Sequence, residues 1–348
     1  MKYYKLTEKD LEKCIDFAVR RYFAKKGNPN RTTGQARGLG AMINDWVGGK
    51  AIEIGVQKIL EQFSNSKELE LDFEVYNRIA QDPDIIKVAE KGATRSRDPN
   101  VYVEIKNYSE NDRWLGLSME QVNTIKKSKI LNGDPEKAYI IYASLNDTTE
   151  DKEKRLDLLG AFLQVATREE YAKLFEKFVK LGDIFVKVNY VLSLKDLEDY
   201  GTIFKRGEKV YETNIFREVR KDIKNLEEIQ IPNGIIPKLD YGGYPYPEKI
   251  SDIKVDGVIK MYKKQNKKKT AFFVKADTEC IVENKVLGTY NLAKGKIYRF
   301  EFGPIGRNPD IFRDVIWISA NKAKGLFGGD LKLEEVVEKR LGEVAERI

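Results

Sequence analysis

The spacing of apolar residues changes along the chain, and this change limits the possible folds more than any other feature. Residues 7–25 and 50–63 repeat apolar side chains at helical intervals, and Thr7 and Asp10 are placed as a capping pair. Residues 69–107 instead form short alternating segments separated by Pro, Gly and Asn, which is typical of strands. Further helices are expected at 118–131 and within 150–181, and further strands at 137–145 and 183–194. This order predicts an α/β core.

The C-terminal part of the chain has a different character. From about residue 240, short strand-like segments follow one another between turn residues. They predict a β-rich module over residues 240–348 that ends in a helix, for which Asp330 is a candidate cap. Residues 1–200 then form the α/β domain, and residues 201–239 connect the two. The expected fold class is α/β with a C-terminal β-rich module.

The chain has no histidine among its 348 residues. This absence excludes hydrolases that depend on a Ser-His-Asp or Cys-His arrangement and nucleases with a catalytic histidine. Acid–base and metal chemistry must then use carboxylates, lysine, tyrosine and water, and oxygen ligands suit a hard cation such as Mg²⁺. Cys14 and Cys280 lack the spacing of a zinc site or a disulfide framework.

Net charge and hydropathy indicate the kind of partner. The 62 basic and 55 acidic residues give a net charge of +7 and a sequence pI of about 8.9, which favours a polyanionic partner. An apolar content of 41% is enough for a globular core. No apolar run is long enough to span a membrane, and the first residues do not resemble a secretory signal, so a cytoplasmic protein with no membrane partner is expected.

Residues 101–107 carry the most informative pattern in the α/β part. In VYVEIKN the side chains of a strand alternate, so Glu104 and Lys106 share one face while three β-branched residues share the other. Upstream, Asp84 follows Pro83 and enters the segment DIIKVAE. A hairpin closed by residues 91–100 is expected to bring Asp84 beside Glu104. Two acids and one lysine then meet at one point.

This combination suits phosphodiester hydrolysis. Carboxylates hold one or two Mg²⁺ ions, which lower the pKa of bound water and stabilise the charge that develops on the phosphoryl group. A lysine orients or helps to deprotonate the attacking water, or neutralises a phosphate oxygen, and so replaces the missing histidine. Asp84, Glu104 and Lys106 are therefore candidate catalytic residues, with Asp84 and Glu104 as metal ligands.

Pro83-Asp84 followed by Glu104-Ile105-Lys106 resembles the motif of the PD-(D/E)xK nuclease superfamily. The resemblance covers roughly residues 45–145. It implies a restriction-endonuclease-like core, a mixed sheet flanked by helices, in which the acids bind Mg²⁺. It also implies a further acidic ligand on a preceding helix, and Glu53 occupies that position.

On this basis the chain is expected to be a type II restriction endonuclease that cuts double-stranded DNA at a short specific sequence with Mg²⁺. The sequence contains no GxxxxGK[ST] motif, which argues against an ATP-driven restriction subunit. Symmetric cutting calls for a homodimer, and a cognate DNA methyltransferase is the expected functional companion. The β-rich module is expected to assist DNA recognition.

Other assignments of these residues stay open. Glu104 and Lys106 also fit an ordinary surface ion pair on a half-exposed strand. Asp98, shortly before Glu104, is an alternative first acid, although its spacing suits a turn better than a partner strand. Glu53 fits the polar border of a helix face equally well.

Residues after the predicted catalytic strand and a lysine cluster in the β-rich module are candidates for DNA binding. Gln121 lies one turn into the following helix, where related nucleases place a glutamine near the scissile phosphate, but it also fits a capping box with Ser118. The lysine cluster is expected at a hairpin tip. The candidate DNA-binding residues are Asn107, Tyr108, Arg113, Gln121, Lys263, Lys264, Lys267, Lys268 and Lys269.

Two other functions fit the same residues. A structure-specific repair or recombination nuclease of the same superfamily cuts branched or damaged DNA irrespective of sequence. A non-catalytic DNA-binding protein on the nuclease scaffold binds DNA but does not cut it in Mg²⁺.

Overall fold

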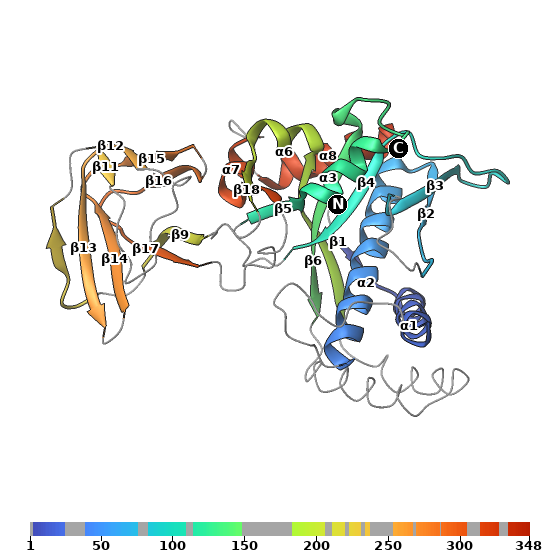
Figure 1. Ribbon diagram of the computed structural model, residues 1–348, viewed down its shortest axis with the longest axis horizontal. Coiled ribbons are helices and arrows are strands. Elements are labelled where there is room, and N and C mark those ends of the chain that lie inside the picture. Colours follow the sequence, from blue (N-terminus) through green and yellow to red (C-terminus); the bar gives the residue numbers. More distant parts are fainter. Residues whose placement is uncertain are drawn as a thin grey trace. The chain divides into compact units, whose positions relative to one another are not determined.

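The structure is a computed structural model of the chain, and its helices and strands form two compact units (Figure 1). Unit 1 comprises Met1–Asn111, Glu120–Asp199 and Leu331–Ile348, and unit 2 comprises Asp112–Met119 and Tyr200–Asp330. The chain is mixed α/β, as the order of periodicities predicted. The residues described are 3–24, 39–75, 83–108, 114–147, 183–205, 211–219, 223–230, 234–236, 253–266, 269–285, 287–304, 314–326 and 333–348.

A four-stranded mixed sheet forms the centre of unit 1, in the order β1-β7-β6-β4. Its strands are β1 (Tyr3–Lys5), β7 (Ile184–Ser193), β6 (Ala138–Asp147) and β4 (Tyr102–Asn107). β4 runs parallel to β6, whereas β7 runs antiparallel to both β6 and β1. β4 is therefore an edge strand, and its residues are open to contacts from other elements.

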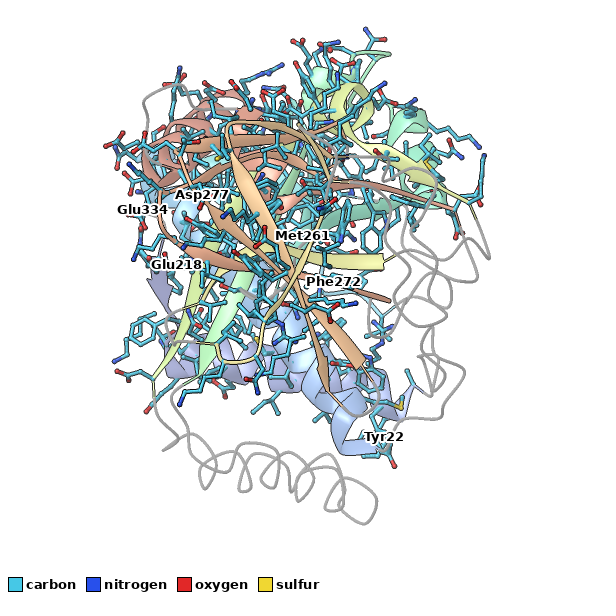
Figure 2. The ribbon with its side chains drawn as sticks, turned by 90° about the vertical axis from the view of Figure 1, so that its left-hand side faces the viewer. Tyr22, Glu218, Met261, Phe272, Asp277 and Glu334 are labelled. Atoms are coloured by element: carbon cyan, nitrogen blue, oxygen red, sulfur yellow. The ribbon has the colours of Figure 1, made fainter. Side chains whose placement is uncertain are left out.

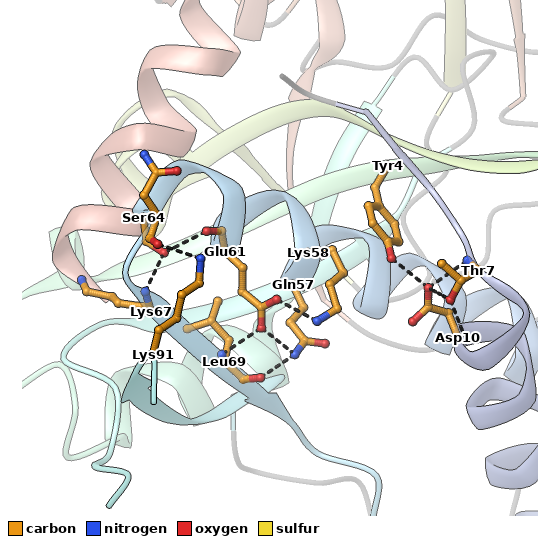
Figure 3. A network of polar contacts seen from close by, with 11 residues as sticks. Tyr4, Thr7, Asp10, Gln57, Lys58, Glu61, Ser64, Lys67, Leu69 and Lys91 are labelled. Carbon is orange, nitrogen blue, oxygen red and sulfur yellow. Dashed lines mark hydrogen bonds and ion pairs between the residues drawn. The ribbon is translucent and has the colours of Figure 1, made fainter. Parts of the chain in front are cut away.

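Two helices pack together beside this sheet, α1 (Glu8–Phe23) and α2 (Leu39–Ser64). The predicted capping pair is confirmed: the Asp10 backbone N–H donates to the Thr7 hydroxyl, and the Thr7 backbone N–H donates to the Asp10 carboxylate (Figure 3). α2 begins well before the expected start near residue 50. Its apolar face packs against β4, β6 and β7.

A polar network joins the end of α2 to the next strand, β2 (Lys67–Leu71) (Figure 3). The Glu61 carboxylate accepts hydrogen bonds from Gln57 at 3.1 Å, from Lys58 at 2.7 Å and from the Leu69 backbone N–H at 3.0 Å. Because Leu69 belongs to β2, these bonds hold that strand against α2.

β2 pairs antiparallel with β3 (Ile85–Glu90), and this pairing corrects one expectation. The sequence predicted a hairpin between the segment after Asp84 and residues 101–107. The structure instead pairs β3 with β2 and β4 with β6, so the two segments are not neighbours in one ladder. The expected hairpin is wrong because each strand satisfies its backbone hydrogen bonds with a different partner.

The C-terminal helix α8 (Leu333–Arg347) belongs to unit 1, not to the β-rich module. Its apolar stripe, including Val337, Leu341 and Val344, is buried in the same core as α2. The other helices of unit 1 among the described residues are α3 (Met119–Lys127), the 3-10 helix η1 (Pro135–Lys137) and α6 (Leu194–Tyr200). α3 is shorter than the expected 118–131. The helices expected within 150–181 and the expected cap Asp330 lie outside the described residues.

The described residues of unit 2 form three antiparallel sheets, in the orders β10-β13-β14-β17-β9, β11-β12-β15-β16 and β5-β18-β8. Its core includes Met261 and Phe272, which project from neighbouring strands (Figure 2). Its elements are β5 (Trp114–Ser118), β8 (Thr202–Phe204), β9 (Tyr211–Glu218), β10 (Glu227–Ile229), β11 (Ile235–Ile236), β12 (Ile253–Asp256), β13 (Ile259–Asn266), β14 (Lys269–Ala276), β15 (Cys280–Asn284), β16 (Gly288–Leu292), β17 (Ile297–Pro304), β18 (Val315–Ser319) and α7 (Ala320–Leu326).

The predicted β-rich character of this part is observed, but its boundaries differ from 240–348. Residues 201–239, expected to be a connecting segment, contribute strands β8 to β11 because Phe204, Phe216 and Ile236 are buried in the unit 2 core. β5, from residues before α3, also belongs here because it pairs with β18.

Candidate metal centre

Glu104 and Lys106 lie side by side on β4, as the alternation of the strand predicted. The Lys106 Nζ atom is 2.5 Å from the Glu104 Oε1 atom, and the two side chains are 25% and 12% exposed. Val101, Val103 and Ile105, which alternate with this pair in sequence, point the other way into the core with α2. The ion pair is therefore mostly shielded from water, unlike an ordinary surface pair.

Asp84 lies directly against the open edge of β4. Its backbone N–H donates to the Val103 carbonyl at 3.0 Å, and its Oδ2 atom accepts the Ile105 N–H at 2.6 Å. Val103 and Ile105, the two β4 residues that bond Asp84, are the neighbours of Glu104 in sequence. The expected proximity of Asp84 to Glu104 is thus present, although one backbone and one side-chain hydrogen bond at the sheet edge produce it rather than a hairpin.

The alternative first acid, Asp98, lies elsewhere. Its carboxylate is 2.6 Å from the Lys87 Nζ atom, and its side chain is 78% exposed. Lys87 lowers the pKa of Asp98, as expected for a solvent-exposed ion pair. Asp84, by contrast, is one of the carboxylates that raise the pKa of Lys106. The geometry therefore favours Asp84 as the first acid.

Glu53 approaches the same cluster from α2, together with a lysine that sequence analysis did not single out. The Lys50 ammonium donates to the Glu53 carboxylate and, at 2.6 Å, to the Asp72 carbonyl. It also lies 4.8 Å from the centre of the Phe17 ring. The spacing of Lys50 and Glu53 by three residues on a helix indicated the pair, but only packing shows that the lysine is buried.

The charges of these side chains act on one another. Burial raises the pKa of Asp84 well above its ordinary value, and the carboxylates of Glu104 and Glu53 raise it further. Burial also raises the pKa of Glu53, against the opposing effect of Lys50. Burial by itself lowers the pKa of Lys106, but Glu104 and Asp84 outweigh it, so the net shift is upward. The cluster has more buried negative charge than its lysines balance.

Other polar side chains surround Glu104. The Gln121 amide donates to the Glu104 Oε1 atom at 3.2 Å, and the Tyr102 hydroxyl donates to its Oε2 atom at 3.5 Å. Tyr142 of β6 stands beside Lys106 in the parallel register, and burial together with Glu104 raises its pKa. Gln121 is therefore part of the candidate site. Its sequence position fitted this role and a capping box with Ser118 equally well.

The donor set fits a hard divalent cation. Asp84, Glu104 and Glu53 supply only oxygen atoms, which Mg²⁺ prefers. Burial is the main cause of the raised pKa values of Asp84 and Glu53, and the neighbouring carboxylates add to it. Within the described ranges, no three acidic, histidine or cysteine side chains already form a close metal-binding group. Glu53 and Glu104 each bind a lysine instead.

No family model, curated protein or solved structure matches this chain. The site residues therefore carry the functional assignment by themselves. All of them belong to unit 1, from α2, the residue before β3, β4 and α3. In the part of the chain that the structure describes, no helix is long and apolar enough to cross a membrane.

The candidate DNA-binding residues near β4 have different surroundings. Asn107 is exposed at the end of the strand. Tyr108 is buried, and its ring centre lies 5.4 Å from that of Tyr190, so its ring packs in the core and a contact with DNA stays a prediction. An aromatic ring after a strand suits core packing as well as base stacking, and the sequence does not distinguish the two. Arg113 lies outside the described residues.

The lysine cluster in unit 2 flanks a β-hairpin, as predicted, because β13 pairs with β14 down to Asn266 opposite Lys269. Lys263 and Lys264 are consecutive in β13 and therefore point to opposite faces. Lys263 is 2.8 Å from Glu227, which offsets part of its charge. Lys267 and Lys268 lie outside the described residues, and only the backbone of Lys269 is described.

Proposed function

We propose that this protein is a Mg²⁺-dependent endodeoxyribonuclease of the PD-(D/E)xK type. The observation that carries the proposal is the placement of Asp84 beside Glu104 and Lys106 at the open edge of β4, with Glu53 of α2 close enough to interact electrostatically with all three. A mixed sheet with α2 packed on it is compatible with a restriction-endonuclease-like core. The narrower proposal is a type II restriction endonuclease acting on double-stranded DNA.

In this proposal Asp84 and Glu104 hold Mg²⁺, with Glu53 as a further ligand. Bound Mg²⁺ supplies an activated water and stabilises negative charge on the phosphoryl group. Because neighbouring carboxylates keep Lys106 protonated, the lysine acts as a positive charge that orients the attacking water or neutralises a phosphate oxygen. Gln121 holds the Glu104 carboxylate in place.

Cleavage of an intact plasmid in Mg²⁺, with EDTA as the blank, tests this function. Glu104→Ala and Lys106→Ala are each expected to lower the rate by about 10²-fold or more, since each removes a charge at the reacting centre. Asp98→Ala is the matched control, because it removes an exposed acid paired to Lys87 and is expected to cut normally. Normal cutting by both site variants would rule out this site.

The pattern of products separates the narrower proposals. Discrete bands from intact duplex support a restriction enzyme, for which a homodimer and a cognate DNA methyltransferase are proposed as partners. Cutting confined to branched DNA indicates a repair or recombination nuclease. Binding without cutting in Mg²⁺ indicates a non-catalytic DNA-binding protein.

A further inference from the structure

Arg21 of α1 lies on an aromatic surface next to the candidate metal centre. Its guanidinium carbon lies 5.3 Å from the centre of the Trp46 ring and 5.9 Å from that of the Phe17 ring. The Nε atom is buried, and no acceptor in the described part of the chain takes its hydrogen bond. A buried N–H without an acceptor destabilises a fold, and a bound ligand that supplies an acceptor removes that cost.

The position of Arg21 connects it to the site rather than to the protein surface at large. Glu53 lies close enough to interact electrostatically with the guanidinium. Phe17 also contacts Lys50, the lysine that binds Glu53. The Glu53 carboxylate is paired with Lys50. The Arg21 Nε–H, on the same aromatic surface, has no acceptor among the described residues.

The neighbouring residue shows what an arginine on this helix does when it has a structural role. Arg20 Nε is 2.7 Å from the Asp16 carboxylate, one turn earlier, and both side chains are 40% exposed. Arg20 thus forms an ordinary exposed helix pair. Arg21 instead rests on two aromatic rings, which restrict its orientation before any ligand binds.

We infer that Arg21 binds a phosphate of the DNA strand held at the metal centre, which rests on the proposed function. A guanidinium matches the geometry of a phosphate and donates two parallel hydrogen bonds to it. The aromatic rings hold the arginine in position, so little side-chain entropy is lost on binding. Arg21 is thus a substrate-binding residue on α1, whereas the proposed metal ligands come from α2, the residue before β3, and β4.

The test measures binding of the full-length protein to a DNA duplex in Ca²⁺ over a range of salt concentrations. Arg21→Met keeps the aliphatic stem against the rings and removes the charge. It is expected to weaken binding by about tenfold, the loss of one charged hydrogen-bonded contact, and to lower the slope of log K against log salt by about 1. Arg21→Lys keeps the charge but loses the planar guanidinium with its two parallel hydrogen bonds. It is therefore expected to retain the salt slope and to lose several-fold in affinity.

Arg20→Met is the matched control and is expected to bind as the wild type, because its charge is already paired on the exposed side of α1. Thermal unfolding of each variant separates a folding defect from a binding defect. If Arg21→Met does not fold, the affinity of Arg21→Lys provides the test. An unchanged slope and affinity in Arg21→Met would overturn the inference.

The outcomes also separate this inference from the proposed function. A wild type that cuts DNA while Arg21→Met binds normally refutes only the role of Arg21. A wild type that binds DNA with an Arg21-dependent salt slope but never cuts refutes only the nuclease. A wild type that neither binds nor cuts DNA refutes both.

Discussion

Burial of acids close to one another is the main energetic feature of the candidate site at the scale of residues. Asp84 and Glu53 both lose hydration, and both experience the negative charge of Glu104. Lys50 and Lys106 offset part of that charge. The folded protein therefore holds protons on these carboxyls more tightly than the unfolded chain does.

The pH dependence of stability follows from this difference. A carboxyl whose pKa is raised by folding makes the folded state bind more protons, so the free energy of unfolding falls as pH rises above the ordinary value of 3.8 for Asp84. In EDTA, Asp84→Asn is expected to flatten this fall, because the amide does not titrate and still accepts the Ile105 N–H. Urea unfolding at several pH values measures it.

Two further measurements complete that experiment. Asp98→Asn is expected to show the same fall in the free energy of unfolding with rising pH as the wild type. Lys87 lowers the pKa of Asp98, so the Asp98 carboxyl contributes to the pH dependence with the opposite sign. Saturating Mg²⁺ is expected to raise the stability of the wild type most at high pH, where the carboxylates are ionised. An Asp84→Asn protein with the same pH profile as the wild type would contradict the assignment of the raised pKa to Asp84.

At the scale of elements, a glycine in α2 determines how closely this helix approaches the sheet. A Cβ atom built on Gly55 would lie 2.3 Å from the Cβ atom of Val186 in β7. Real Cβ atoms do not approach so closely, so the helix reaches the strand there only because the residue is glycine. Gly48, on the same helix, has no neighbour within 4 Å of its built Cβ atom in the described part of the chain.

The two glycines of α2 are therefore expected to respond in opposite ways to the same substitution. Gly55→Ala is expected to destabilise the fold by about 1–3 kcal/mol through overpacking against Val186. Gly48→Ala is expected to stabilise it by up to about 1 kcal/mol, because alanine favours the helix and finds open space. Denaturant unfolding of both variants gives the comparison, and a stabilised Gly55→Ala protein would show that α2 stands further from β7.

At the scale of the whole molecule, the chain passes between its two units several times. Unit 1 receives three separate stretches of sequence, and the last of them ends in α8. The candidate site lies entirely in unit 1, so it depends on a core that the C-terminal residues complete. A boundary drawn by sequence position alone assigns α8 to the wrong unit.

Substitutions in α8 test this dependence. Leu341 is fully buried in the core that contains α2, so Leu341→Ala is expected to lower the free energy of unfolding by about 2–5 kcal/mol and to lower the temperature of thermal unfolding. Lys339→Ala, at an exposed position of the same helix, is the control and is expected to change stability by less than about 0.5 kcal/mol. Equal stabilities of the two variants would exclude α8 from that core.

Local patterns in the sequence were sufficient for several features of this protein. The capping pair Thr7 and Asp10, the shared face of Glu104 and Lys106, and the hairpin of β13 and β14 all follow from backbone periodicity or hydrogen bonding between near neighbours. The lack of histidine also restricts the chemistry that the chain can perform, whatever its fold. The local features depend on a few consecutive residues, so the sequence determines them directly.

Tertiary packing determined which of these elements meet. It placed Asp84 against β4 while pairing β3 with β2, buried Tyr108 and Lys50, and assigned α8 to unit 1. An amphipathic helix or strand shows that it has an apolar face but not which other face will cover it. That choice depends on packing between residues far apart in the chain, because burial is non-directional and many pairings satisfy a local pattern equally well.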